Sequence, residues 1–300
     1  MSDIKLKTNS AKLVLALATI LVTAYMWLFL HAESQLAIGV LIVLALVLAI
    51  VGKKTGTTQK VEQAAAIQPG LARLWSIMGV LALVAAFYDS HFVLMMICAV
   101  LLYSTACMGL TLQFGFVGVA NFAGAAFFGI GSYTTAVLAT HTGLPQLANI
   151  AISGVVAAII GSVLILPVLR TRGHYAALVT IAFGILFKTF IEVNDVLGGP
   201  QGLQVPGMQL FGHAFNDGFK LFGIEFSFYV SYVLLSLVIC ACAFVLVKAL
   251  ERSWVGLSMD VVRTDETAAA TFGLHIARWK VIAFTMGNLF AGIAGSVYGM

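Results

Sequence analysis

The sequence has 300 residues, of which 61% are hydrophobic and only 9% are charged, and its formal net charge at pH 7 is +4. A soluble domain carries roughly 25% charged residues, so this chain has too few ions to cover a water-exposed globule. The hydrophobic content excludes intrinsic disorder, and four cysteines in 300 residues exclude a disulfide scaffold. The class that remains is an integral membrane protein.

Nine segments are candidates for membrane spans. A bilayer core of about 30 Å requires about 20 apolar residues in a helix. The segments cover residues 13–30, 36–51, 74–88, 92–112, 121–140, 148–169, 175–193, 226–250 and 281–300, and the third is the shortest. The sequence therefore predicts an all-α, polytopic membrane protein with about nine transmembrane helices.

The basic residues predict the side of the membrane on which each loop lies. With a cytoplasmic N-terminus, 14 of the 16 Lys and Arg residues fall in cytoplasmic segments, and only Lys188 and Lys220 fall outside. The first apolar segment is followed by Leu30-His31-Ala32, which is a poor signal-peptidase site. We therefore expect an uncleaved first span and an N-terminus in the cytoplasm.

The composition changes between the second and third spans. Residues 52–73 contain Lys, Thr, Gln and one Pro-Gly pair, which is typical of a mobile linker. We therefore predict that residues 1–73 form an N-terminal extension with two spans and a cytoplasmic linker. The membrane core is predicted to cover residues 74–300 and to include a cytoplasmic loop at residues 251–280.

A glycine-rich segment at residues 109–131 stands out within the core, with six glycines in 23 residues. Glycine weakens a helix, and a broken helix in a bilayer must be buried in protein or line a water-filled cavity. The alternative is close packing of helices through small residues, and the sequence leaves both open. The candidates for lining a solute pathway in this segment are Asn121, Phe122, Gly124, Phe128 and Gly131. Thr180 and Phe183 of a later span are further candidates, because a hydroxyl and a ring could meet the polar and apolar ends of a solute.

The longest predicted outer loop, residues 194–225, carries near its start Gly198, Gly199, Pro200, Gln201 and Gly202. The turn chemistry of Gly and Pro favours an ordered loop, and we expect this loop to be a docking surface. Lys188 and Glu192 lie four residues apart near the outer end of the preceding span. We expect their long side chains to reach the membrane surface there.

The cytoplasmic loop contains a predicted two-turn helix. Thr264 is a good N-cap, Asp265 and Glu266 suit the positive end of a helix, and Gly273 suits its end. Ala268 and Ala269 lie between them. A helix this short is marginal alone, so it is expected to pack either on this chain's own spans or on another protein.

The last span carries small residues at intervals of four, at Gly287, Ala291, Gly295 and Gly299. Such a stripe lets a second helix approach closely. The sequence does not say whether that helix belongs to this chain or to another subunit.

Four parts of the chain together resemble a known family. Residues 101–138, 169–184, 198–202 and 252–298, in that order, are similar to the permease subunits of bacterial branched-chain amino acid ABC importers, and most of all to the M-type subunit of the permease pair. The resemblance covers roughly residues 92–300. Members of this family usually continue with further hydrophobic segments, so we expect the sequence to be a C-terminally truncated piece.

The resemblance implies a function and a set of partners. The short helix with Ala268, Ala269 and Gly273, preceded by Glu266, would be a coupling helix that docks into the ATPase subunit, and the Gly198–Gly202 turn would dock a periplasmic binding protein. The expected partners are a second permease subunit, two ATP-binding subunits and the binding protein, with no nucleic acid. The expected location is the bacterial inner (plasma) membrane. The expected substrate is leucine, isoleucine or valine, carried by alternating access.

The chain itself is not expected to be an enzyme or to bind a cofactor. Its Gly52-Lys53 pair lacks the glycine and hydroxyl residue of a phosphate-binding loop, so ATP and Mg would be bound by the partner ATPase. Metal-ligand sets and the motifs of membrane proteases and acyltransferases do not occur in the sequence. The alternatives are an ABC permease for urea, amides or other amino acids, and an ion-coupled secondary transporter. The latter would need an ionisable residue in the middle of a span.

Overall fold

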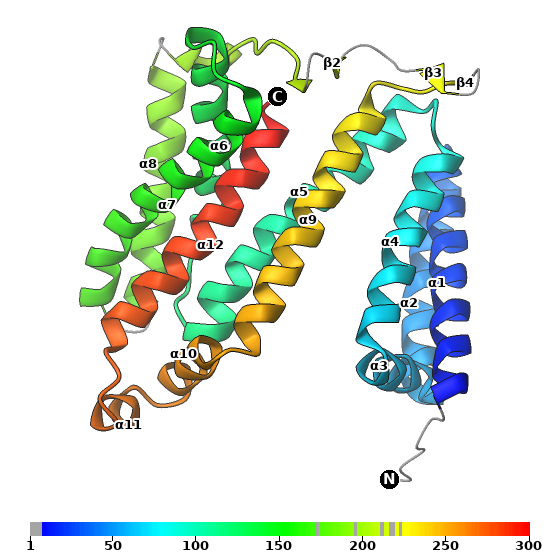
Figure 1. The fold of residues 1–300 in the computed structure, drawn as a ribbon, viewed down its shortest axis with the longest axis horizontal. Helices are drawn as coiled ribbons and strands as arrows, with labels where there is room; N and C mark the ends of the chain where they lie inside the picture. The colour runs from blue at the N-terminus through cyan, green and yellow to red at the C-terminus, as the bar shows by residue number, and fades with distance from the viewer. Residues whose placement is uncertain (1–7, 172–173, 195–196, 211–212, 216–219, 222–223) are drawn as a thin grey trace. The chain divides into compact units, whose positions relative to one another are not determined.

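The computed structural model describes residues 8–171, 174–194, 197–210, 213–215, 220–221 and 224–300 (Figure 1). In chain order the elements are α1 (Thr8–His31), α2 (Gln35–Thr55), α3 (Thr57–Ile67), α4 (Pro69–Ala86), α5 (His91–Leu110), the π-helical turn η1 (Thr111–Phe116), α6 (Gly124–His141), α7 (Gln146–Arg170), α8 (His174–Val193), the 3-10 turn η3 (Gly199–Gln201), the strands β1 (Gln209–Leu210), β2 (His213–Ala214), β3 (Lys220–Leu221) and β4 (Ile224–Glu225), and the helices α9 (Tyr229–Glu251), α10 (Trp254–Thr264), α11 (Glu266–Thr271) and α12 (Ile276–Tyr298). The strands form two small antiparallel hairpins, β1–β2 and β3–β4.

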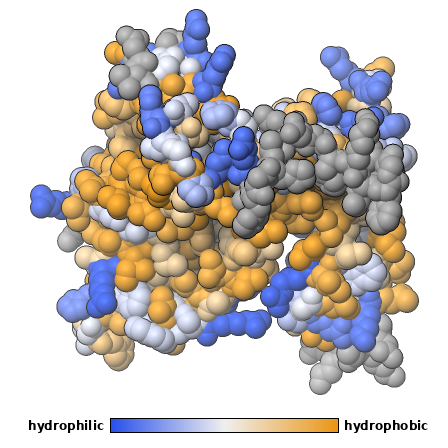
Figure 2. All heavy atoms as spheres, turned by 45° about the horizontal axis from the view of Figure 1, so that its top comes forward, coloured by the Kyte–Doolittle hydropathy of each residue, from blue (hydrophilic) through white to orange (hydrophobic). Residues whose placement is uncertain are grey.

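This helical architecture confirms the prediction of an all-α, polytopic membrane protein. Within the described residues, eight helices are long and apolar enough to cross a bilayer, namely α1, α2, α4, α5 with η1, α7, α8, α9 and α12. The remaining predicted span corresponds to α6, which has 18 residues but contains several Gly, Ser and Thr residues that reduce its hydrophobicity. Figure 2 shows hydrophobic residues over much of the visible surface, as expected where side chains contact lipid.

The contacts divide the chain into two compact units, residues 1–94 and residues 95–300. In the described part of the first unit, α1 packs on α3 and α4, and Ala64 of α3 is buried against Ala11 and Leu15 of α1. The segment predicted as a linker, residues 52–73, is helical over most of its length. Gly56 separates α2 from α3 with a φ of 71°, and Pro69 begins α4 in the first turn, where its missing N–H costs nothing. By contacts α4 belongs with the N-terminal helices, and the functional division at residue 73 remains a prediction.

The second unit is built around α12, which packs mainly against α7 and α6 and also contacts η1, α9 and α10. Small residues allow this close packing. A Cβ at Gly295 would overlap the backbone carbonyl of Phe128 in α6, and one at Gly287 would overlap Gln113 of η1. The small-residue stripe predicted in the last span therefore packs against helices of this same chain.

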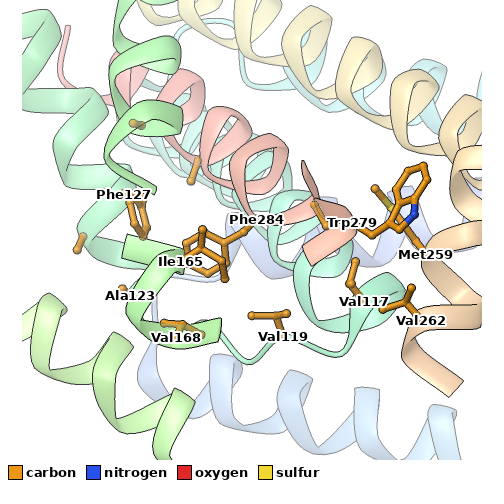
Figure 3. Packing of buried hydrophobic residues seen from close by; sticks show 14 of the residues in the cluster. Val117, Val119, Ala123, Phe127, Ile165, Val168, Met259, Val262, Trp279 and Phe284 are labelled. Carbon is orange, nitrogen blue, oxygen red and sulfur yellow. The ribbon is translucent and has the colours of Figure 1, made fainter. Parts of the chain in front are cut away.

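The largest buried cluster of the second unit lies where α6, α7, α10 and α12 meet. Phe127, Ile165 and Phe284 are fully buried there, and Phe127 and Phe284 meet edge to face with ring centroids 6.0 Å apart (Figure 3). Met259, Val262 and Trp279 extend the cluster toward α10 and α11. Figure 1 places α10 and α11 at one end of this unit, which we call the α11 end, and η3, β1 and β2 at the opposite end, the hairpin end.

Candidate functional site

The connection between α5 and α6 is a non-helical segment that is partly buried in the second unit. The helix formed by α5 and η1 ends at Phe116, α6 begins at Gly124, and Gly118 has a φ of 71°, which favours glycine. Three residues of the segment are buried in the core cluster, namely Val117, Val119 and Ala123 (Figure 3). Non-helical backbone at membrane depth is tolerated only inside protein or beside a cavity, so this segment is a candidate for function.

Three side-chain amides hold this segment in place. Gln113 Nε2 donates to Asn288 Oδ1 at 2.9 Å and to the Phe284 carbonyl at 3.0 Å, and Asn121 Nδ2 donates to Gln113 Oε1 at 2.7 Å. Asn121 Oδ1 in turn accepts from the Ala123 N–H at 2.9 Å. The network satisfies the Ala123 N–H, which precedes α6, and it ties the segment to α12.

Thr180 of α8 holds the same segment from the other side. Its hydroxyl accepts a hydrogen bond from the Phe122 N–H at 3.1 Å and donates to the Ala177 carbonyl at 2.8 Å, and the residue is fully buried. Phe183 stacks on Phe127 with ring centroids 5.5 Å apart. Thr180 therefore supports the segment, and Phe183 packs on the core.

A groove of about 850 Å³ opens between the start of α6 and α8. It is lined by Phe122, Ala123, Ala125, Ala126, Tyr133, Ile181, Gly184, Ile185, Phe187, Lys188, Ile191, Glu192 and Gly199. One end reaches the interrupted segment at Phe122, whose side chain is 64% exposed, and the other reaches η3 at Gly199. The groove therefore joins the predicted pathway segment to the predicted docking turn.

The groove also contains charged groups. Lys188 Nζ lies 3.5 Å from Glu192 Oε1, and both side chains line the groove. A second hollow, of about 470 Å³, lies between α1 and α4 and is lined almost entirely by apolar atoms. The groove along α8 is the better candidate site, because it combines apolar surface with a few polar groups.

The other predicted pathway residues lie in helix contacts. Phe128 packs between Tyr103 and Tyr298, with ring centroids 5.5 Å and 5.3 Å away. A Cβ at Gly131 would overlap the Gly292 carbonyl of α12, and one at Gly124 would come within 3.2 Å of the Leu110 side chain. Of the seven predicted pathway residues, Phe122 is the one that lines the groove. Whether any of them contacts a solute remains a prediction.

The short helix α11 forms where the sequence predicts it, but its N-cap is Asp265. The Asp265 carboxylate accepts from the N–H groups of Thr267 at 2.8 Å and Ala268 at 3.1 Å. The prediction of Thr264 as N-cap is wrong, because Thr264 ends the preceding helix α10 and its hydroxyl donates to the Asp260 carbonyl. Both residue types cap well, so the sequence alone did not separate them.

One face of α11 packs on this chain. Ala269 is fully buried in the core cluster with Val262 and Trp279, and Glu266 Oε1 lies 2.7 Å from Lys280 Nζ of α12. Gly273 ends the helix with a φ of 79°, as its position predicts.

The α11 end also carries exposed hydrophobic residues. Phe272 is 83% exposed, and Trp254 and Leu257 of α10 are 70% and 66% exposed. The sequence prediction did not single out these three side chains. The helix α10 was not predicted either; it begins at the N-cap Ser253, whose hydroxyl accepts from the Gly256 N–H.

The Gly198–Gly202 turn is compact. Gly198, Gly199 and Gly202 all have positive φ, and the Gly199 N–H donates to the Asn194 carbonyl at 3.2 Å. Pro200 and Gln201 complete the turn η3, which contacts α8.

The segment after this turn is anchored on two helices. Gln146, at the start of α7, donates to the Gly207 carbonyl at 3.2 Å and accepts from the Gln209 N–H. Tyr232 of α9 accepts from the N–H of Met208, which is fully buried. The described parts of the predicted outer loop therefore include an ordered surface at the hairpin end.

Comparison with known proteins identifies the family of this chain. A family model described as the permease component of branched-chain amino acid transport systems matches residues 92–300. The chain belongs to this family. The interrupted segment, the groove along α8, the α11 end and the Gly198–Gly202 turn lie within the matched residues, whereas α1 to α4 precede them.

Two curated relatives are similar to the matched region. They are the high-affinity branched-chain amino acid transport system permease proteins LivM of Escherichia coli K12 and Salmonella typhimurium LT2. Each is 32% identical over 212 residues, which is 66% of this chain and 50% of the relative. The chain thus spans about half the length of these relatives. Comparison with solved structures gave no match.

Family membership and the apolar helices together make this chain a multi-pass membrane protein of a permease family.

Proposed function

We propose that this chain is the permease subunit of an ATP-driven importer of branched-chain amino acids in a bacterial inner membrane. The observation that carries the proposal is the groove along α8, which runs from η3 at the hairpin end to the interrupted segment at Phe122. Family membership supports the transport role, and the names of the two LivM relatives support the substrate class.

The hairpin end is assigned to the periplasm and the α11 end to the cytoplasm. With this orientation, most Lys and Arg residues lie on the cytoplasmic side, and so does the N-terminus. A periplasmic binding protein would then dock on the Gly198–Gly202 turn and on the surface anchored by Gln146 and Tyr232. It would release the solute directly at the open end of the groove.

The α11 end is assigned to the ATPase. Two ATP-binding subunits would bind ATP and Mg and carry out hydrolysis, and a second permease subunit would complete the pathway. Because Ala269 is buried in this chain's own core, we assign the direct contact with the ATPase to Phe272 and the exposed side of α10. The ion pair between Glu266 and Lys280 would pass the movement of α11 to α12.

Transport would proceed by alternating access. Phe122 lies at the inner end of the groove, on a segment that side-chain hydrogen bonds tie to α8 and α12. A rearrangement of this segment would open the groove toward the cytoplasm. An ion-coupled mechanism is disfavoured because Lys188 and Glu192, the charged pair of α8, lie near one end of the helix rather than at its middle.

The test uses Gly184, because a Cβ at this position meets no atom within 4 Å and the added side chain enters the groove. Gly184→Phe in the complete transporter, reconstituted in proteoliposomes with its binding protein, should reduce leucine uptake at least tenfold while the complex still assembles. The matched control is Leu186→Phe, since Leu186 is 68% exposed on the same helix and does not line the groove. Equal uptake by both variants would reject the groove as the pathway.

Substrate competition distinguishes the alternative solutes. Excess unlabelled isoleucine or valine should suppress leucine uptake by the unmodified complex, whereas urea and acetamide should not. Uptake of urea without uptake of leucine would replace the substrate assignment and leave the permease assignment intact.

A further inference from the structure

We propose that Lys188 and Glu192 form a subsite that binds the charged end of a zwitterionic amino acid, with the α-carboxylate on Lys188 and the α-ammonium on Glu192. This inference rests on the proposed function and specifies how the groove would recognise its substrate class. The hydrocarbon side chain of the solute would lie toward Gly184, farther along the groove.

The spacing of these residues places them in a row. Gly184, Lys188 and Glu192 follow one another at intervals of four residues on α8, so they share one face of the helix. All three line the groove, and Lys188 Nζ lies 3.5 Å from Glu192 Oε1. The groove therefore has two opposite charges at one end and an open position one helical turn below them.

The ion pair is suited to exchanging partners. The side chains of Lys188 and Glu192 are 75% and 53% exposed, and exposed pairs of this kind contribute little to the stability of a fold. A zwitterion brings one positive and one negative group on the same carbon atom. It can therefore replace one ion pair by two charge-assisted hydrogen bonds without leaving either protein charge unpaired.

The rest of the groove suits an aliphatic or aromatic side chain. Ile185, Phe187 and Ile191 supply apolar surface beside the charged pair, and Gly184 leaves space that a larger residue would fill. A neutral solute such as urea offers no charge to either residue and would leave the Lys188–Glu192 pair as it is, and a single cation would match only Glu192. The charge pattern thus selects zwitterions with a hydrophobic side chain.

The alternative is that the long Lys188 and Glu192 side chains only carry their charges to the membrane surface. Both interpretations explain why the residues lie near one end of α8. Only the subsite interpretation predicts that an amino acid protects the groove and that this protection depends on the two charges.

The experiment measures protection of a single cysteine in the groove. Cys98, Cys107, Cys240 and Cys242 are first replaced by alanine in the assembled complex, and Ile185→Cys is then introduced. The rate of labelling by an impermeant thiol reagent is measured with and without millimolar L-leucine. Leucine should slow labelling at least fivefold, whereas leucinamide, which lacks the carboxylate, and 4-methylpentanoate, which lacks the ammonium group, should change it less than twofold.

Charge variants test the two residues in the same background. Lys188→Gln and Glu192→Gln should each abolish protection by leucine, and Lys188→Arg should retain it. The matched control is Lys248→Gln, which removes the Lys248–Glu251 ion pair at the other end of the unit and should leave protection unchanged. Leucine protection that survives in Lys188→Gln and Glu192→Gln, or that is absent in every variant, would overturn the subsite.

Uptake by the unmodified complex separates this inference from the proposed function. Leucine uptake without charge-dependent protection would overturn the subsite and leave the permease function standing. Charge-dependent protection without leucine uptake would reject the proposed importer and leave the subsite standing as a binding site for amino acids.

Discussion

Two glycine-rich regions of this protein use glycine in different ways. In α12, Gly287, Gly292 and Gly295 face the backbones or side chains of α5, α6, η1 and α7, so close that a Cβ would overlap them. In the segment between η1 and α6, Gly118 instead allows the chain to take a positive φ and leave the helix. The same residue type therefore makes one helix the centre of the unit and interrupts another.

The sequence left open whether the glycines of residues 109–131 allow close helix packing or break a helix, and the structure answers this question. Close packing and a broken helix are both found in this segment. Gly109 and Gly131 pack against carbonyls of α12, whereas Gly118 lies in the break. Polar groups accompany the break: Gln113, Asn121 and Thr180 bond the interrupted backbone or one another.

The largest effect is expected where glycine contacts backbone. Gly295→Val would force a Cβ into the Phe128 carbonyl, and neither backbone can move without shifting α6 or α12. We expect a loss of about 3 kcal/mol or more, seen as little or no monodisperse protein after size-exclusion chromatography. The matched control is Gly184→Val, because that position has no atom within 4 Å. Similar yields of both variants would contradict the packing role of α12.

The amide network should give the next largest effect. Gln113→Leu keeps the approximate size of the side chain but leaves Asn121 Nδ2 and Asn288 Oδ1 with fewer partners in a buried site. The expected cost is about 1–3 kcal/mol, measured as a lower apparent melting temperature in detergent. The exposed Gln63→Leu serves as control and should change stability by less than about 0.5 kcal/mol.

A double-mutant cycle sharpens this prediction. If Gln113 and Asn288 act through their mutual hydrogen bond, Gln113→Leu combined with Asn288→Leu should cost less than the sum of the single variants. Additive losses would indicate that the two amides stabilise the segment independently.

The membrane spans could be predicted from sequence because lipid requires long apolar helices whose backbone groups are satisfied internally. The predicted span at residues 175–193 differs from α8 by one residue, and the span at residues 148–169 lies within α7. The helix α10 was missed because its 11 residues form an amphipathic helix rather than an uninterrupted apolar run, in a loop that also contains charges. The helix α4 begins at Pro69, before the apolar run that marked the span.

The candidate site was less predictable, because its parts come together only in three dimensions. Gln113 bonds Asn288, 175 residues away, and the spacing of amides along the chain carries no sign of this contact. Phe122 was predicted from the glycine-rich segment and does line the groove. Lys188 and Glu192 were recognised as a pair on one helix face, but the groove that they share with Phe122 and Gly199 depends on how α6 and α8 pack.

Substitution in the break itself should have a smaller effect. A Cβ at Gly118 would meet only the Arg263 side chain, at an ordinary contact distance of 3.5 Å, so Gly118→Ala introduces no overlap. Its cost comes from the positive φ and is expected to be about 1 kcal/mol, again as a lower apparent melting temperature. Gly118→Asn should cost less, since asparagine tolerates this conformation better than alanine. A loss as large as that of Gly295→Val would mean that packing rather than backbone conformation limits the break.

The smallest effect is expected at Gly124, the first residue of α6. This glycine lies next to the break and also contacts a neighbouring helix. Its Cβ would lie 3.2 Å from a methyl carbon of Leu110, and the end of a leucine side chain can move by a few tenths of an ångström. Replacing glycine by alanine in a helix is favourable by up to about 1 kcal/mol, which offsets this displacement. Gly124→Ala should therefore change stability by less than about 0.5 kcal/mol in the same melting experiment. Gly124→Leu should destabilise the protein because the larger side chain must displace Leu110 altogether. If both variants were equally stable, α5 and α6 would be packed more loosely here than the 3.2 Å contact indicates. Gly124 would then not be needed for close packing of the two helices.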